Sequence, residues 1–220
     1  VDVFVMRDAE PGLPAYVAAH VAPHCSVLNA GEAHVSHPTQ GLLDVLTIRQ
    51  RKGNLGDLTV AIVGDLSHSR VARSTGRALL TLGVGELRLV SPASLMPPPD
   101  ELAGASRHHS LAEGIRGADV VMALRIQHER MSGEDKLDAA TFYREWGLSA
   151  QHLKNARPDV IVMHPGPMNR GVEITSEVAD GPHSVIRQQV TNGVAVRMAV
   201  LSTIVRNVQE RNVEAGRRAI

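Results

Sequence analysis

Residues 58–90 constrain the fold more than any other part of the chain. The apolar run 58–64 contains several β-branched residues and predicts a buried strand. A helical pattern follows over about 71–82, and a second apolar run lies at 87–90. Strand, helix and strand in this order form a βαβ unit, and such units build parallel sheets. We therefore expect an α/β protein with a parallel sheet.

Four more short apolar runs predict strands, at 1–6, 25–29, 119–124 and 159–163. Arginines lie at or just beyond the ends of several predicted strands: Arg7, Arg70, Arg125 (with Gln127) and Arg170. One arginine alone is more often a surface charge. The carboxyl ends of parallel strands share one edge of a sheet, however, so these arginines together predict a site for a small polyanion.

The turn after the strand at 58–64 argues against a dinucleotide cofactor. Gly64-Asp-Leu-Ser-His-Ser69 lacks the GxGxxG glycines that let a pyrophosphate approach the backbone. The hydroxyl, imidazole and guanidinium groups between Ser67 and Arg70 suit a small anion instead. We therefore expect neither a nicotinamide nor a flavin.

The segment His164-Pro-Gly-Pro-Met-Asn-Arg170 ends the last predicted strand. Two prolines around a glycine fix the path of the backbone, and one of the X-Pro bonds is a candidate for cis geometry. A rigid loop at the carboxyl end of a strand is where open α/β sheets bind ligands. The alternative is a turn that only ends the strand.

His37-Pro-Thr-Gln40 opens a predicted helix with apolar positions at Leu42, Leu43 and Leu46. Pro38 suits the first helical turn. A helix start offers free N–H groups and the positive end of the dipole, which favour anions. His37 and Gln40 are therefore candidate anion ligands. The alternatives are a simple helix cap for His37 and a solvated first-turn residue for Gln40.

Later stretches have more general interpretations. The polar run 128–136 is either a solvated surface loop or a mobile lid over the site. Residues 184–205 predict a long core or interface helix, in which Asn192-Gly193 is an irregularity without a physical explanation. The charged tail 206–220 is expected to fray.

Composition excludes several classes of function. The 23 Lys and Arg residues balance 23 Asp and Glu, and only 2% of residues are aromatic, which argues against nucleic-acid binding. The one cysteine, Cys25, excludes an internal disulfide and a cysteine-based zinc site, and it fits a reducing compartment. The sequence shows neither a transmembrane run nor a signal-peptide pattern. We expect a cytoplasmic protein that does not contact membranes.

Five motifs occur along the chain: Asn29-Ala-Gly31, His37-Pro-Thr-Gln40, Gly64-Asp-Leu-x-His-Ser-Arg70, Leu124-Arg-Ile-Gln-x-Glu-Arg130 and His164-Pro-Gly-Pro-Met-Asn-Arg170. In their order and spacing they resemble the aspartate transcarbamoylase family, in particular its bacterial catalytic chains. The resemblance runs from Val1 to about Val205.

The resemblance implies a doubly wound, parallel-sheet α/β fold in which the first domain is partial and the second complete. Residues 1–49 would be the C-terminal part of a carbamoyl-phosphate-binding domain. Residues 50–185 would form an L-aspartate-binding domain, and the helix in 186–220 would return to the first domain.

The resemblance also implies the roles of single residues. The carbamoyl-phosphate ligands would be Arg7, His37, Gln40 and the backbone around Gly166 and Pro167, whose peptide bond is expected to be cis. The aspartate carboxylates would be held by Arg70, Arg125 and Gln127. The run after Gln127 would be the loop that closes on the substrates.

The implied reaction is aspartate carbamoyl transfer, a committed step of pyrimidine biosynthesis. The α-amine of aspartate attacks the carbamoyl carbon and phosphate leaves, while Arg7 and His37 stabilise the charge on the carbonyl oxygen. The reaction requires no cofactor and no metal. The family implies homotrimers, which in some members associate with regulatory or dihydroorotase-like chains.

Two departures from the family pattern affect these expectations. The chain begins directly in a predicted strand without an initiator Met, which we interpret as a fragment or processed product of a longer protein. About a hundred residues of the family's first domain are absent, including its S-T-R-T-R phosphate-binding segment and a serine–lysine loop. Ser74-Thr75-Gly76-Arg77 is no substitute, because it lies inside a predicted helix. We therefore expect the 220 residues alone to be inactive.

Two alternatives stay open. Ornithine transcarbamoylases share the fold, but they usually carry an H-C-L-P turn, with a cysteine where this chain has Gly166. The two arginines aimed at carboxylates favour aspartate over ornithine. The second alternative is a non-catalytic subunit that serves as a binding or scaffold module.

Overall fold

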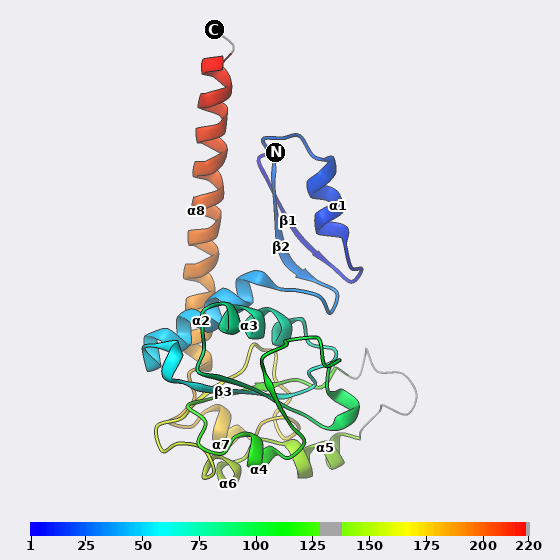
Figure 1. Cartoon of the computed structure of the whole chain (residues 1–220), viewed down its shortest axis with the longest axis vertical. Helices are drawn as coiled ribbons and strands as arrows, with labels where there is room; N and C mark the ends of the chain where they lie inside the picture. Colours follow the sequence, from blue (N-terminus) through cyan, green and yellow to red (C-terminus); the bar gives the residue numbers. More distant parts are fainter. Residues whose placement is uncertain (128–137, 219–220) are drawn as a thin grey trace.

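Five parallel strands form the central sheet, in the order β5-β4-β3-β6-β7. The sheet lies in the lower part of Figure 1, where β3 is labelled. The computed structural model describes residues 1–127 and 138–218 of the chain. The strands are β3 (Thr59–Gly64), β4 (Glu86–Val90), β5 (Ser106–His108), β6 (Val120–Leu124) and β7 (Ile161–Met163). Strands β3 and β6 are almost wholly buried, as their continuous apolar runs predict for strands covered on both faces.

Helices cover both faces of this sheet, so the predicted doubly wound arrangement is confirmed. Ile62 and Met122 pack in a core with α2 (Pro38–Lys52) and α3 (Arg70–Thr81). Ala61 and Val121, one position earlier on the same strands, pack in a second core on the opposite face. That face is covered by α4 (Leu111–Gly114), α5 (Ala139–Trp146), α6 (Ala150–Leu153) and α7 (Ser176–Ala179).

The strand order reverses direction between β3 and β6. From β3 the chain moves outward to β4 and β5, and it then returns to β6 on the other side of β3. Gly64 at the end of β3 is paired with Leu124 at the end of β6. The segments 65–70 and 125–127 therefore leave the sheet side by side, at the kind of switch point where open α/β sheets bind ligands.

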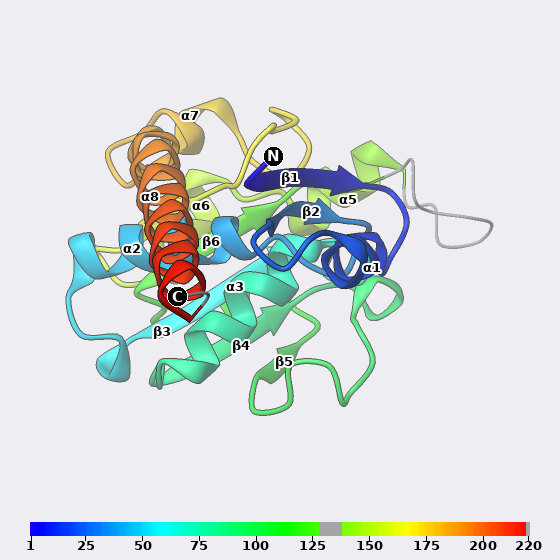
Figure 2. The ribbon, with the colours of Figure 1, turned by 90° about the horizontal axis from the view of Figure 1, so that it is seen from above.

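A separate unit precedes the central sheet. It consists of β1 (Val3–Asp8), α1 (Leu13–His20) and β2 (Ser26–Glu32), and its two strands form a parallel pair of their own. Tyr16 and His20 stack on each other in α1. Figure 2 shows this unit and α8 (Ile186–Arg218) lying next to each other above the sheet.

Helix α8 packs against α2 through polar side chains. Asn192 donates to the Thr47 hydroxyl over 2.8 Å and to Gln50 Oε1 over 2.9 Å, and the Gln188 side chain also donates to Gln50 Oε1. These bonds account for Asn192 within the predicted helix. The expectation of a frayed tail from Arg206 is wrong for most of its length, because α8 continues to Arg218.

Two short elements differ from the expectations. Strand β5 lies in a stretch with no strand pattern, and α7 lies in a stretch for which no helix was predicted. The Thr175 hydroxyl caps α7 by accepting from the Val178 N–H. Short 3-10 turns lie at Leu55–Asp57 and Ala93–Leu95. Within the described residues, no helix has the length and apolar character needed to cross a membrane.

Candidate functional site

A cavity of about 430 Å³ lies where the ends of β3, β6 and β7 face the N-terminal unit and α8. This volume is ordinary for a small-molecule site. The structure brings all eight predicted site residues to its lining: Arg7, His37, Gln40, Arg70, Arg125, Gln127, Gly166 and Pro167. Their roles toward a ligand stay predictions.

The floor of the cavity is fixed by Asp65, a fully buried carboxylate directly after β3. Its Oδ2 accepts from the Gln127 N–H over 3.1 Å, and its Oδ1 lies 2.9 Å from His68 Nδ1. The Gln127 side chain donates in turn to the His68 carbonyl over 2.9 Å. These bonds tie the segments after β3 and β6 together, and they fix the backbone on both sides of the cavity floor.

Arg70 connects the sheet to the N-terminal unit. It is the first residue of α3, where the Ser69 hydroxyl caps the helix by accepting from the Ala72 N–H. Its guanidinium donates to the Ala33 carbonyl over 3.2 Å and passes close to Gly31, where an added Cβ would lie 3.0 Å from Cζ. Gly31 also has a φ of +127°, so the chain needs glycine there for both shape and space.

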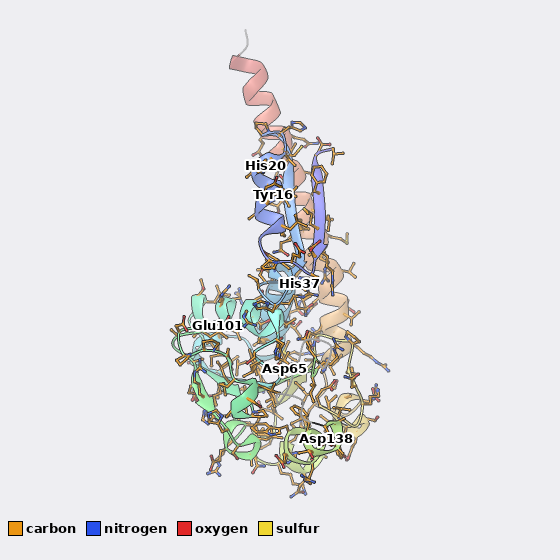
Figure 3. The ribbon with its side chains drawn as sticks, turned by 90° about the vertical axis from the view of Figure 1, so that its right-hand side faces the viewer. Tyr16, His20, His37, Asp65, Glu101 and Asp138 are labelled. Carbon is orange, nitrogen blue, oxygen red and sulfur yellow. The ribbon has the colours of Figure 1, made fainter. Side chains whose placement is uncertain are left out.

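His37 stands at the N-cap position of α2, but its side chain does not cap the helix. Its backbone N–H donates to the Ser74 hydroxyl over 2.7 Å. His37 is only 8% exposed, and its Nδ1 has no hydrogen-bond partner within the described part of the chain. Burial, followed by the charges of Arg197, Arg70 and Arg7, lowers the pKa of His37 to about 4. The imidazole is therefore neutral near pH 7, and its Nδ1 is a buried nitrogen without a partner among the described residues. His37 lies where the N-terminal unit meets the domain of the central sheet (Figure 3).

Arg197 of α8 also lines the cavity, and no sequence pattern predicted it there. The side chains of Arg7 and Arg197 make no hydrogen bond or ion pair with a residue in the described ranges. The only sequence signal is the unexplained Gly193, four residues earlier. An added Cβ at Gly193 would lie 2.6 Å from Arg197 Nη1, so the glycine leaves room for the guanidinium.

The loop after β7 is held by a buried pair. His164 Nδ1 accepts from the Gly166 N–H over 2.9 Å, so the ring proton is on Nε2, which donates to Glu173 Oε1 over 3.1 Å. The same Oε1 accepts from the Asn169 N–H over 2.6 Å. The Gly166–Pro167 bond is cis, as expected. The hydrogen bonds of His164 and Glu173 hold this loop in place as a wall of the cavity.

A family model described as aspartate/ornithine carbamoyltransferase, Asp/Orn binding domain, matches residues 56–204. The chain belongs to the aspartate/ornithine carbamoyltransferase family.

Solved carbamoyltransferase structures show the same fold. The aspartate transcarbamoylase of Trypanosoma cruzi, in complex with carbamoyl aspartate and phosphate, is 31% identical with a TM-score of 0.80, covering 91% of this chain and 65% of that one. The ornithine carbamoyltransferase of Thermus thermophilus is 28% identical with a TM-score of 0.80, covering 93% and 67%. The Pyrococcus furiosus ornithine enzyme is 27% identical with a TM-score of 0.81, covering 92% and 66%. The chain thus spans about two thirds of the length of these carbamoyltransferases, and both amino-acid specificities occur among them.

One of the arginines predicted to share the edge of the sheet, Arg170, lies outside the cavity. Arg170 forms a two-pronged pair with Asp180 on the surface, at 2.6 and 3.0 Å, and it does not line the site. The expectation that it shares the edge with Arg7, Arg70 and Arg125 is wrong, because the loop turns its side chain toward a nearby carboxylate. The predicted lid at 128–136 lies outside the described residues.

Proposed function

We propose that this chain is the substrate-binding part of an aspartate carbamoyltransferase, which converts carbamoyl phosphate and L-aspartate to N-carbamoyl-L-aspartate and phosphate. One observation carries the proposal. Four arginines, Arg7, Arg70, Arg125 and Arg197, line one cavity, and no carboxylate in the described ranges lines it. Two substrates that each carry about two negative charges match such a lining. The cationic side chain of ornithine would meet repulsion from the same arginines.

In this proposal Arg7, His37 and Gln40 hold carbamoyl phosphate with the backbone at Gly166 and Pro167. Arg70, Arg125 and Gln127 hold the two carboxylates of aspartate. The α-amine attacks the carbamoyl carbon, the C–O bond to phosphate breaks, and the proton that the amine loses passes to the departing phosphate.

Two side chains stabilise the charge that develops on the carbonyl oxygen. Arg7 supplies a guanidinium that no described residue neutralises, and neutral His37 can donate an N–H without adding another positive charge to the cavity. A hydrogen-bond donor that is already in position for such an oxygen lowers the activation free energy by about 3–4 kcal/mol. Holding the two substrates together contributes a further large part.

We further propose the domain organisation that the family resemblance implies. Residues 1–49 belong to a carbamoyl-phosphate domain, 50–185 form the aspartate domain, and 186–220 return to the first. The protein would be a cytoplasmic trimer, either alone or with regulatory or dihydroorotase-like chains, that acts in pyrimidine biosynthesis. The 220 residues alone would bind ligands but would be inactive in carbamoyl transfer.

Ornithine carbamoyl transfer is the second candidate, because ornithine enzymes match this fold at the same TM-score as the aspartate enzyme. Calorimetric titration separates the two. The chain should bind N-(phosphonacetyl)-L-aspartate, a compound found with the Trypanosoma cruzi enzyme, at least tenfold more tightly than the analogue built on ornithine. The reverse order would establish the ornithine assignment. Binding of neither would support a non-catalytic scaffold.

A further inference from the structure

A buried carboxyl group lies beneath the cavity and belongs to none of the roles above. Asp44, on α2, is 0% exposed. Its Oδ1 accepts from Gln40 Nε2 and from Gln189 Nε2, both over 3.0 Å, and its Oδ2 accepts from the Thr75 hydroxyl over 2.6 Å. The donors come from α2, α8 and α3, so Asp44 lies where three helices meet. Burying a carboxylate at a helix junction is costly, and an apolar side chain would fill the same space more cheaply.

The first consequence concerns the amide of Gln40, which lines the cavity. An ionised carboxylate accepts hydrogen bonds and donates none. The end of the Gln40 amide that faces Asp44 must therefore be the NH₂. The carbonyl oxygen Oε1 is then the polar atom that this side chain has left for a ligand.

The second consequence concerns Gln189 of α8. Its NH₂ is fixed on Asp44 in the same way, so its Oε1 is free to accept from the His164 N–H over 2.9 Å. His164 opens the loop that carries Gly166 and Pro167. One carboxylate thus sets the orientation of two amides, one that lines the cavity and one that anchors the cavity's loop.

We propose that Asp44 is a positioning residue that turns the Gln40 amide so that the cavity meets a hydrogen-bond acceptor, which makes the site select a carbamoyl group by its NH₂. The inference rests on the proposed function, because it concerns how that site recognises its phosphorylated substrate. A carbamoyl NH₂ donates to Gln40 Oε1. A methyl group in its place leaves a desolvated carbonyl oxygen without a partner, and sites of this kind reject the analogue that lacks the donor.

Acetyl phosphate is the matching probe, since it replaces the NH₂ of carbamoyl phosphate by CH₃ and keeps the phosphate. In calorimetric titrations the unmodified chain should prefer carbamoyl phosphate to acetyl phosphate by about tenfold, the ratio that one hydrogen bond of ordinary net strength produces. Asp44→Leu should reduce this ratio to about twofold, because the Gln40 amide can then turn over.

Two variants control for the carboxyl group and for loss of packing. Asp44→Asn keeps a carbonyl oxygen for both amides and can donate to the Thr75 hydroxyl, so it should keep the preference within about threefold. Thr75→Val removes one buried bond to the same carboxyl but leaves both amides in place. It should lower the melting temperature and leave the preference unchanged.

The outcomes separate the two proposals. An unmodified chain that binds neither phosphate compound overturns the proposed function together with this inference. If the unmodified chain prefers carbamoyl phosphate to acetyl phosphate and Asp44→Leu keeps the same preference, only the inference about Asp44 is overturned. A loss of preference in Thr75→Val as large as in Asp44→Leu also overturns it, since the effect would then follow from packing.

A measurement on the unmodified chain decides the case if Asp44→Leu does not fold. Burial raises the pKa of the Asp44 carboxyl to about 6. The hydrogen bonds from Thr75, Gln189 and Gln40 and the charge of Arg197 on α8 lower this pKa, but by less than burial raises it. From helix α3, the side chain that contacts this carboxyl is Thr75, which carries no charge. The NMR signals of the Gln40 and Gln189 NH₂ groups should therefore shift with one common midpoint near pH 6. Independent or absent shifts would overturn the proposal.

Discussion

The guanidinium of Arg197 lies against Gly193, one turn earlier on α8. An added Cβ at Gly193 would stand 2.6 Å from Arg197 Nη1 and 3.3 Å from a methyl carbon of Leu43. Gly193 does not line the cavity, yet its lack of a side chain leaves the space that a cationic group of the site occupies. A single methyl group at Gly193 therefore tests the position of this arginine without removing its charge.

Gly193→Ala should weaken binding of N-(phosphonacetyl)-L-aspartate about tenfold, because Arg197 must leave its present position. Arg197→Gln should weaken it about tenfold to a hundredfold, the range for a lost bond between charged groups. Titration calorimetry measures both. The double variant should bind no worse than Arg197→Gln alone, since both changes act through one group. Thr191→Ala, on the exposed side of the same helix, is the matched control and should bind normally. Normal binding by Gly193→Ala would show that this position of Arg197 is immaterial.

Arg125 and Arg170 can be compared directly, because each follows a strand of the same sheet but only Arg125 lines the cavity. Arg125 lines the cavity, whereas Arg170 pairs with Asp180 on the surface. Arg125→Gln should reduce affinity for the same analogue by at least tenfold, because a two-pronged contact to a carboxylate is lost. Arg170→Gln should leave the dissociation constant within about twofold. Equal losses in the two variants would argue for a general effect of surface charge.

The sequence predicts well those parts of the fold in which several neighbouring residues indicate the same structure. Strands β3 and β6 are buried on both faces, so every position is apolar or small and the pattern has no ambiguity. The parallel order then brings the ends of these strands together, which is why the sequence alone predicts Arg70, Arg125 and Gln127 in one site. The predicted positions of His37 and Gln40 follow from a proline that favours a helix start.

The parts that the sequence does not predict depend on partners far along the chain. Arg197 sits in a helix whose exposed and buried faces look alike in sequence, and only its packing beside α2 turns it toward the cavity. Arg170 follows the same strand-end rule as Arg125, but Asp180, ten residues later, competes for its guanidinium. Strand β5 has three residues, too few for a pattern, and it forms because β4 offers an edge.

The neutral state of His37 gives the free energy of unfolding a pH dependence. The folded-state pKa of His37 is about 4 and its ordinary value is 6.5. Between these values the unfolded chain binds a proton that the folded chain does not. The contribution of His37 to the free energy of unfolding is therefore fully present above pH 6.5 and is lost as the pH falls toward 4. The advantage of the unmodified chain over His37→Asn should shrink by about 2 kcal/mol between pH 7 and pH 4.5.

Urea unfolding at the two pH values measures this difference, and Asp44, which is present in both proteins, largely cancels. A constant difference would show that His37 titrates alike in the folded and unfolded chains. Calorimetry at pH 5.5 in buffers of different ionisation enthalpy provides a second readout. An anion bound beside His37 raises its pKa, so binding should take up protons in the unmodified chain and take up fewer in His37→Asn.

Glu173 should matter for both stability and binding, because it anchors the wall of the cavity. Its Oε1 accepts from His164 Nε2 and from the Asn169 N–H, while its Oε2 is buried without a hydrogen-bond partner in the described ranges. Glu173→Ala leaves a buried imidazole N–H without an acceptor, which should cost about 1–3 kcal/mol in urea unfolding. It should also weaken binding of the aspartate analogue several-fold, because Gly166 and Pro167 lose their support.

Glu173→Gln separates the hydrogen bond from the charge. It keeps an oxygen for His164 and Asn169, so we expect an affinity within about twofold of the unmodified chain. Glu177→Ala, an exposed glutamate in the first turn of α7, is the matched control and should change neither quantity. If Glu173→Ala unfolds at lower urea but binds the analogue normally, the pair of His164 and Glu173 stabilises the domain without shaping the site. If both quantities fall and Glu173→Gln restores the affinity, the hydrogen bonds rather than the buried charge hold the loop in its binding position.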